Sequence, residues 1–311
     1  MQSTTRQTAR LPVGVRVTVH SGPSRTSRLT AVAAVAAVAA VAAVAAVACG
    51  PRPSPAGRGA AERVVSLAPA FTELLFAIGA GDRVVGRTAW CDMPPAALDV
   101  PSVGDGIAPN VEAIVARNPD LVVLYASTAN TAAGERLASV GVRTMTLAMD
   151  RLEHVPAAAQ ALGEAVGAQT AADSLAAWFT RGLDSARTAP RPAAPPRVVI
   201  LTWDRPPIVI GGGSFQHELL TLAGAENVFG DLPQPSAQVA IETIAARNPD
   251  LVVLLDGDPN PAWADRPEWQ VVPAVRQRRF VTVRGTEFAR PTPRALGAVR
   301  RLRTLLDSVA R

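Results

Sequence analysis

The sequence predicts an α/β protein of two similar lobes, each with a mainly parallel sheet, joined by one long helix with a ligand cleft between the lobes. Three observations lead to this prediction. The nine residues ARNPDLVVL occur twice, at 116–124 and at 246–254. A second pair of similar segments precedes them, RVVSL at 63–67 and RVVIL at 197–201. One helical stretch separates the two halves. Nine identical residues do not recur by chance in a chain of 311, so the halves are related by duplication.

The first 48 residues predict an export signal. Residues 1–30 contain arginines and no acid, residues 31–48 are only alanine and valine, and Cys49 follows small residues. This order is typical of a lipoprotein signal peptide, with cleavage before Cys49 and diacylation of its thiol. The apolar run is at the lower edge of a membrane span. An uncleaved signal anchor and a start codon placed too early are therefore the alternatives.

Charge and composition exclude several function classes. The full chain carries +5, but the leader holds five arginines and no acid, so the remaining chain is near neutral. No basic footprint for nucleic acid remains. The sequence contains no lysine, which excludes a Walker A loop and a Schiff-base mechanism.

Residues 49–60, rich in proline and glycine, predict a tether without a core of its own. If Cys49 is lipidated, Cys91 has no partner and there is no disulfide framework. We expect Cys91 to be a small buried residue; a metal ligand and a redox sensor are the alternatives.

The N-terminal lobe is predicted at 61–165. A strand at 63–67 leads to a helix at 70–79, which ends at a glycine-rich turn, and a further strand follows at 84–88. Apolar residues from Val111 follow helical spacing. Asn-Pro-Asp then ends that helix, because the residue before proline avoids the helical region. The continuous apolar run at 121–124 is typical of a parallel strand buried on both faces.

Residues 166–190 predict the joining helix, with an apolar stripe and a length of roughly 30 Å. The C-terminal lobe is predicted at 191–311. Its strand at 197–202 precedes a helix from Ser214, a good N-cap, to about Gly224; the second copy of the repeat and a strand at 280–283 follow. In such lobes the carboxyl ends of the strands face the cleft.

Aromatic residues are scarce, 4% of the chain, and several follow predicted strands. Flat, rigid rings at strand ends would suit a broad, flat ligand. Packing beneath a loop is the alternative for each, and for Trp178 on the joining helix it is the prediction. Trp263 and Trp269 fall in a long loop, and Asp256 and Asp258 could also rim the cleft. The candidate ligand-binding residues are Trp90, Tyr125, Trp203, Phe288 and Arg290.

The whole chain after the leader resembles the helical-backbone substrate-binding proteins of ABC importers. The likeness is carried by RVVSLAPAFTELLFAIGAGDRVVG at 63–86, WCDMPP at 90–95, VG at 103–104, NVEAIVARNPDLVVL at 110–124, the second copy at 241–254, and RPTPR at 290–294. The resemblance implies an exported, lipid-anchored or periplasmic monomer that traps a metal chelate and delivers it to a permease dimer. Family members dock through one glutamate on each lobe, and these positions match Glu112 and Glu242. Stabilisation of a helix dipole is the alternative role for both.

Within the family the likeness is greatest to cobalamin-binding members, which often read Cys-Asp-Tyr-Pro-Pro where this chain reads Cys91-Asp92-Met93-Pro94-Pro95. In those receptors aromatic residues line the pocket, and Trp90, Trp203 and Phe288 fall near the matching loops. Tyr125 is placed by topology alone. We expect Arg290 to meet polar groups of the ligand and Arg294 to be structural. A haem or ferric-siderophore receptor is the alternative, with Tyr125 or His217 as the axial ligand of a haem.

No catalytic or resident metal site is predicted, and no cofactor apart from the bound ligand. After the leader only His154 and His217 remain, too few for a receptor of bare zinc. The pair His217-Glu218 is not followed by the second histidine of a zincin motif. The chain is therefore predicted not to be an enzyme. A bilobed tetrapyrrole chelatase and a structural lipoprotein are the weaker alternatives.

Overall fold

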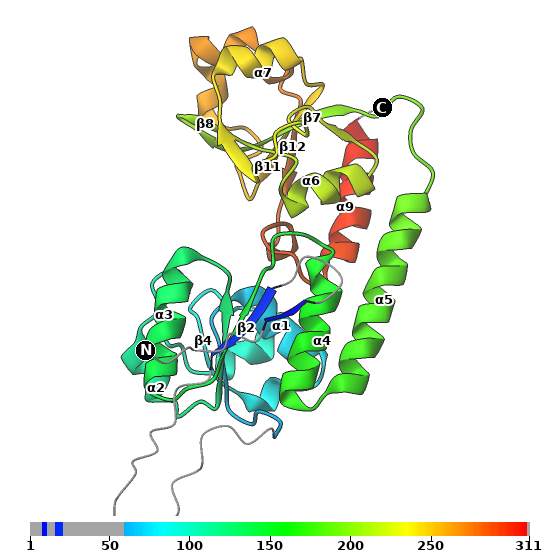
Figure 1. Ribbon diagram of the computed structural model, residues 1–311. Helices are drawn as coiled ribbons and strands as arrows, with labels where there is room; N and C mark the ends of the chain where they lie inside the picture. Colours follow the sequence, from blue (N-terminus) through cyan, green and yellow to red (C-terminus); the bar gives the residue numbers. More distant parts are fainter. Residues whose placement is uncertain (1–7, 11–15, 21–58, 310–311) are drawn as a thin grey trace, which may run out of the picture.

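The computed structural model describes residues 8–10, 16–20 and 59–309. Two α/β lobes are stacked one above the other, and the long helix α5 (Gln169–Thr188) runs along one side of both (Figure 1). The fold class predicted from the repeat is confirmed. In the described part of the chain, no helix is both long and apolar enough to span a bilayer.

The N-terminal lobe is built on a parallel sheet with strand order β6-β5-β3-β4. Its strands are short and nearly fully buried, as the continuous apolar runs predicted. Its elements are β3 (Val64–Ser66), α1 (Pro69–Ala77), the 3₁₀ turn η1 (Gly81–Arg83), β4 (Val84–Arg87), the 3₁₀ turn η2 (Pro95–Asp99), α2 (Val111–Val115), β5 (Leu121–Tyr125), α3 (Thr128–Ser139), β6 (Thr144–Leu147) and α4 (His154–Val166).

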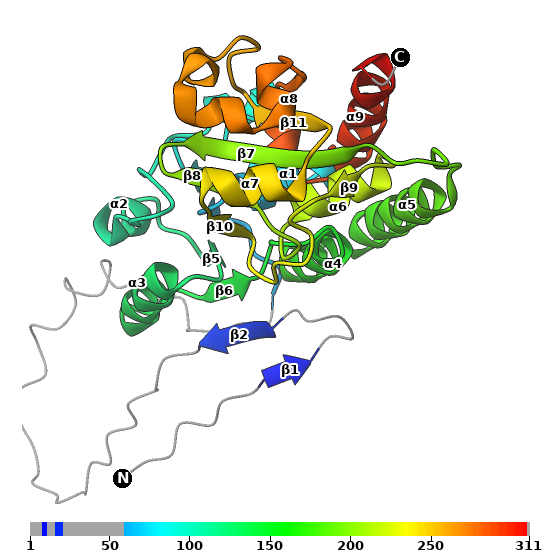
Figure 2. The same ribbon diagram turned by 90° about the horizontal axis from the view of Figure 1, so that it is seen from above.

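Part of the predicted leader is placed on the edge of this sheet. Strand β2 (Arg16–His20) pairs antiparallel with β6, and β1 (Thr8–Arg10) pairs with β2, as Figure 2 shows. The alanine–valine run and Cys49 lie outside the described residues, so export and lipidation stay predictions.

The C-terminal lobe has a mixed sheet with order β10-β8-β7-β11-β12, and β9 pairs with β7. The pairings of β7 with β9 and β11, and of β11 with β12, are parallel as predicted. The sheet is mixed because the chain turns at Arg205-Pro206 and returns as an antiparallel hairpin. The elements are β7 (Arg197–Asp204), β8 (Pro207–Ile210), α6 (Phe215–Leu222), β9 (Glu226–Asn227), β10 (Ser236–Gln238), α7 (Ile241–Arg247), β11 (Leu251–Leu255), the 3₁₀ turns η3 (Ala262–Asp265) and η4 (Pro267–Val271), α8 (Pro273–Arg276), β12 (Phe280–Val283), the 3₁₀ turn η5 (Thr286–Phe288) and α9 (Ala295–Val309).

The repeated Asn-Pro-Asp turn ties each helix end to the start of the neighbouring strand. Asn118 and Asn248 both adopt the left-handed conformation, with φ of 48° and 45°, which asparagine tolerates better than most residues. The carboxylate of Asp120 accepts the backbone N–H groups of Glu62 and Arg63. In the second lobe that of Asp250 accepts the N–H of Arg197 at 2.8 Å.

An arginine at the start of each strand completes the turn from the other side. Arg63 donates to the carbonyl oxygens of Arg117 and Asn118, and Arg197 donates to that of Arg247. Helix ends leave carbonyl groups without internal partners, and the guanidinium groups satisfy some of them. The nonapeptide thus forms the same backbone connection twice.

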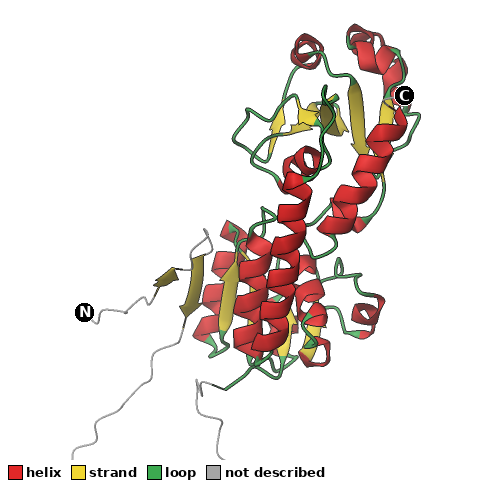
Figure 3. Ribbon diagram, turned by 90° about the vertical axis from the view of Figure 1, so that its right-hand side faces the viewer, coloured by secondary structure: helices red, strands yellow, loops and turns green. Residues whose placement is uncertain are grey.

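Helix α5 packs closely against one helix of each lobe. A Cβ atom at Gly163 of α4 would lie 2.3 Å from the Cβ of Ala172, and one at Gly182 of α5 would lie 2.2 Å from Leu296 of α9. Only glycine permits either approach. Figure 3 shows α4 and α5 side by side along the first lobe.

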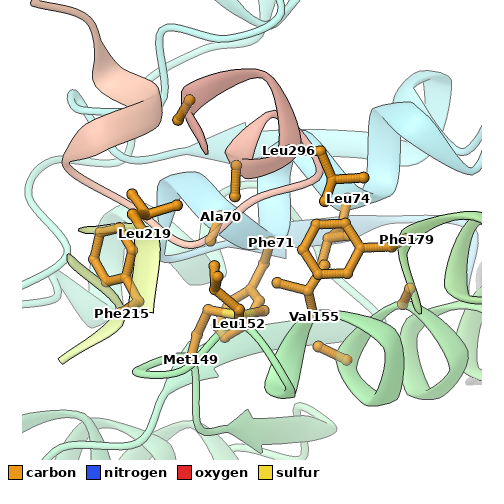
Figure 4. Packing of buried hydrophobic residues seen from close by; sticks show 14 of the residues in the cluster. Ala70, Phe71, Leu74, Met149, Leu152, Val155, Phe179, Phe215, Leu219 and Leu296 are labelled. Carbon is orange, nitrogen blue, oxygen red and sulfur yellow. The ribbon is translucent and has the colours of Figure 1, made fainter. Parts of the chain in front are cut away.

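The largest of three apolar core clusters among the described residues passes from one lobe into the other, and each lobe also has a smaller cluster of its own. The largest cluster contains Phe71 and Leu74 of α1, Val155 of α4, Phe179 of α5, and residues of α6 and α9, and Figure 4 shows these side chains gathered between the helices. Because this cluster belongs to both lobes, movement of one lobe relative to the other would break close packing contacts in the protein interior.

Ion pairs across the lobes accompany this core. The carboxylate of Glu73, only 6% exposed, accepts two hydrogen bonds of 2.8 Å from Arg294 at the start of α9. In another contact, the carboxylate of Glu218 on α6 accepts from Arg151 at 2.6 Å and from the N–H of Leu152 at 2.7 Å. The predicted structural role of Arg294 agrees with its geometry.

We expect Glu73→Gln to lower the free energy of unfolding by about 3 kcal/mol, because it leaves the Arg294 charge without its buried partner. Urea denaturation followed by circular dichroism measures the change. Glu226→Gln is the matched control: its ion pair with Arg197 is about half exposed and should contribute about 0–1 kcal/mol. Equal losses for the two variants would contradict the assignment.

Candidate ligand-binding site

The loops that follow the strands of the two lobes face one another. Asp92, after β4, lies 2.9 Å from Arg290, after β12. Arg151, after β6, donates to the carbonyl oxygen of Gly212, after β8, at 3.1 Å. The Asp92–Arg290 contact therefore brings together loops at the carboxyl ends of parallel strands, as expected for a site between two α/β lobes. Strand β8 runs antiparallel to β7, so the Arg151–Gly212 contact joins the lobes at the other edge of the second sheet.

Two tryptophans are exposed at these strand ends, one on each lobe. Trp90 lies in the loop after β4 and is 63% exposed, and Trp203 lies near the end of β7 and is 59% exposed. The indole N–H of Trp203 donates to the carbonyl oxygen of Arg205 at 2.8 Å, which fixes the ring while leaving its face free. Large apolar rings that stay exposed in a folded protein commonly mark a binding surface.

Two surface hollows also lie at strand ends. A small one of about 110 Å³ adjoins Trp203 in the C-terminal lobe and is also lined by Leu255, Asp258 and Trp263. A larger one of about 580 Å³ lies at the start of α3, next to the end of β5, and its lining includes Ser127, Thr131 and Glu135. Neither hollow alone spans the two lobes.

Tyr125 stands at the end of β5, but its hydroxyl group already has a partner. The side chain is about half buried, and its O–H donates to the carboxylate of Asp150 in the loop after β6. Burial first, and then the Asp150 carboxylate, raise the pKa of Tyr125 well above its usual value near 10. The neutral phenol is therefore strongly favoured, and Tyr125 offers a ligand the edge of its ring more readily than a phenolate oxygen.

Phe288 and Arg290 are less accessible than the sequence suggested. The Phe288 ring is 3% exposed, because the 3₁₀ turn η5 directs it into the core, where the guanidinium of Arg301 lies 5.7 Å above it. The Arg290 side chain is 14% exposed and lies between Asp92 and Glu73. Contact of either with a ligand would need these groups to move.

The remaining aromatic and acidic candidates have structural partners. Trp263 packs on the buried Trp269, with ring centroids 4.5 Å apart. Asp256 accepts the N–H of Gly285, and Asp258 that of Asn260. Trp178 is 47% exposed on α5, away from the strand ends.

The sequence reasoning missed the charged groups that join the lobes. Glu73, Asp92 and Glu218 make these contacts with arginines distant in sequence. One signal was available for Glu73, an acid within the otherwise apolar helix at 69–77. A buried acid requires a partner, but the sequence does not say which arginine supplies it.

Glu112 and Glu242 are both exposed and occupy the first turns of the equivalent helices α2 and α7. The side chain of Asn110 caps α2, whereas Ala240 gives α7 no side-chain cap. The two acids thus keep equivalent places although the helix starts differ.

His154, His217 and Cys91 contact other groups of the protein. Cys91 is buried, with its sulfur 3.1 Å from the Thr88 hydroxyl, as predicted for a small core residue. Nδ1 of His154 accepts the N–H of Asp150. Burial, and next the charge of Arg151, lower the pKa of His217. Within residues 59–309, no three His, Cys, Asp or Glu side chains cluster in a way that could hold a metal ion.

Comparison with known proteins places these features in a family context. The sequence model of the periplasmic binding protein family matches residues 64–286. The vitamin B12-binding protein of Pectobacterium carotovorum subsp. carotovorum (strain PC1) is 29% identical over 251 residues, which cover 80% of this chain and 90% of that protein.

Two solved structures are similar over nearly their whole length. The periplasmic vitamin B12-binding protein BtuF of Vibrio cholerae has a TM-score of 0.67 and 27% identity, covering 81% of this chain and 98% of BtuF. The periplasmic haem-binding protein BhuT, in complex with two haems, has a TM-score of 0.73 and 28% identity, covering 81% of this chain and 100% of BhuT.

Tyr125 is the only tyrosine of the chain, so its titration can be followed directly. We expect absorbance at 295 nm to show little tyrosinate up to about pH 11 while the protein stays folded, because the folded-state pKa is raised. Since the unfolded chain ionises first, this term stabilises the fold fully below pH 10 and is lost above it. Asp150→Asn should move the midpoint back toward 10. A midpoint near 10 in the folded wild-type protein would contradict the Tyr125–Asp150 contact.

Proposed function

The chain belongs to the periplasmic binding protein family, and we propose that it captures cobalamin or a related corrinoid for an ABC importer. The observation that carries this proposal is the pair of exposed tryptophans, Trp90 on one lobe and Trp203 on the other. Trp90 follows β4, and Trp203 lies near the carboxyl end of β7. The named relatives include vitamin B12-binding proteins that align over most of this chain.

The chemistry of the two rings suits a corrinoid. Tryptophan supplies a large flat apolar area at low cost in side-chain entropy, and its N–H can meet a polar substituent. A corrinoid is a broad macrocycle with apolar faces and a polar edge. Two rings on opposed loops can therefore cover it from both sides, and no covalent or metal bond is needed.

A haem receptor is the second candidate, because BhuT is as similar in sequence as BtuF. Iron in haem takes an axial ligand from the protein, and the chain offers two. Tyr125 is poorly prepared, since its hydroxyl group donates to Asp150 and its raised pKa disfavours the phenolate. His217 is neutral, as a haem ligand must be, but it is half buried beside Asn227. These contacts favour the corrinoid. A ferric siderophore is the third candidate ligand.

Delivery to a permease is the second part of the proposal. Glu112 and Glu242 are exposed, carry the same charge and hold equivalent positions in the two repeats. A partner of two related subunits could present one basic site to each acid, and charge pairs of this kind set orientation and association rate. We further propose that lipidation at Cys49 keeps the receptor at the membrane and outside the cytoplasm. The family consists of solute receptors, and we propose no catalytic activity.

Isothermal titration calorimetry of the purified full-length chain tests the ligand. We expect saturable binding of cyanocobalamin at micromolar or lower Kd. Trp90→Ala and Trp203→Ala should each weaken it about tenfold or more, as expected for buried aromatic contacts. Trp178→Ala removes an exposed tryptophan away from the strand ends and should leave Kd unchanged. If only haemin or a ferric siderophore bound, that compound would be assigned as the ligand in place of cobalamin. If none of the three compounds bound, this part of the proposal would be refuted.

Uptake of labelled cyanocobalamin by cells that supply the cognate permease tests the docking acids. Glu112→Ala and Glu242→Ala should each reduce uptake at least fivefold, and the double variant should abolish it, with Kd for the ligand unchanged. Glu164→Ala, which removes an exposed acid from α4, is the control. Normal uptake by the double variant would show that these acids serve only their helices.

A further inference from the structure

The loop that carries Trp90 is fixed at its base by the N-terminal lobe. The guanidinium of Arg87 is buried and donates to the carbonyl oxygens of Thr88 and Ala97, at 3.0 and 2.7 Å. The N–H of Ala89 donates to the carbonyl oxygen of Gly104 at 2.8 Å. Trp90 itself projects from this framework into solvent. The next residue, Cys91, is buried in the same lobe, and its N–H and sulfur both lie 3.1 Å from oxygen atoms of Thr88.

The side chain of Asp92 adds a contact with the other lobe. Asp92, two residues after Trp90, places Oδ1 at 2.9 Å from Nη1 of Arg290. Arg290 belongs to the turn between η5 and α9, so this contact crosses from one lobe to the other. The same Nη1 lies 3.6 Å from the buried carboxylate of Glu73. Arg290 is thus held from two sides by acids of the N-terminal lobe.

The contact between Asp92 and Arg290 is electrostatic and not a well-formed hydrogen bond. Both Asp92 Oδ1 and Arg290 Nη1 are shielded from solvent, yet neither has a partner with hydrogen-bond geometry. Removal of the Asp92 charge would leave Arg290 beside Glu73, at 3.6 Å, and would leave the Trp90 loop without this link to the other lobe. A contact of this kind holds the loop by charge attraction, and its interaction energy depends on the position of the loop.

We propose that Asp92 is a positioning residue for Trp90. Its ion pair with Arg290 fixes the Trp90 loop against the C-terminal lobe, and so sets the place of Trp90 relative to Trp203. The inference rests on the proposed function, since it takes Trp90 as a ligand contact. A loop fixed before binding loses less conformational entropy when the ligand arrives, which strengthens binding without a new contact. Arg290 then acts on the ligand through Asp92 and the loop.

Arg290 could contact the ligand directly, or it could act through Asp92 and the Trp90 loop. These two roles predict different effects of Asp92→Asn on binding. If Arg290 met the ligand directly, loss of the Asp92 charge would free the guanidinium, and binding would be unchanged or tighter. If Asp92 positions Trp90, Asp92→Asn should weaken cyanocobalamin binding about tenfold. It should also have little further effect once Trp90 has been removed.

A double-mutant cycle in the full-length protein separates the two roles. Calorimetry measures Kd for wild type, Asp92→Asn, Trp90→Ala and the double variant. We expect Asp92→Asn to cost about tenfold alone and less than twofold in the Trp90→Ala background. Asp231→Asn removes the acid partner of Arg247 within the C-terminal lobe and should leave Kd unchanged. An equal cost in both backgrounds, or no cost, would overturn the proposal.

A second measurement needs no ligand. Time-resolved anisotropy of Trp90 in the free protein, isolated by difference against Trp90→Phe, reports motion of the ring on the nanosecond scale. We expect Asp92→Asn to at least double the fast component, and Asp231→Asn to leave it unchanged. If wild type bound none of the three titrants, the proposed function would fall, and this measurement alone would decide the positioning role. An unchanged fast component would overturn that role even if cobalamin bound.

Discussion

The apolar core that crosses between the lobes is the constraint on which the rest of the structure depends. The side chains of α1, α4, α5, α6 and α9 form one packed cluster that joins the two lobes. Each lobe also has a smaller apolar cluster of its own. Burial of this kind is the dominant favourable term in folding. It also fixes which strand ends face one another, and hence where Trp90 and Trp203 stand.

Charged groups refine the arrangement that the core imposes. The pair Glu73–Arg294 is buried and doubly hydrogen-bonded, and such pairs specify geometry more than they add stability. Glu218 accepts both a side-chain and a backbone donor from the loop after β6. Two polar contacts thus accompany the apolar cluster, and together they fix both position and rotation of one lobe on the other. The ligand site is built on loops that emerge from this rigid junction.

Much of the fold could be predicted from the sequence because it is local and repeated. The nonapeptide gave a helix, a turn and a strand twice, and α5 was evident from an uninterrupted apolar stripe. The hairpin of β7 and β8 was not predicted, because the sequence predicted a single strand at 197–202 before the helix that starts at Ser214. At the site, the exposure of Trp90 follows from its place after a strand, and Trp203 is exposed near the end of β7. The burial of Phe288 does not, because a 3₁₀ turn sets the direction of its ring. Partners such as Glu73 and Arg294, 221 residues apart, leave no local pattern at all.

The shared core has a consequence for how a partner could recognise the occupied receptor. A hinged receptor reports its ligand by drawing its two lobes together, so that a partner can measure the distance between them. Here the shared apolar cluster opposes such a movement, which would also change the separation between α2 and α7. If Glu112 and Glu242 dock on a permease as proposed, the distance between them would carry little information about the ligand. A permease bound to both acids would then detect the ligand at the edge of the binding site, where the ligand changes the surface between Glu112 and Glu242.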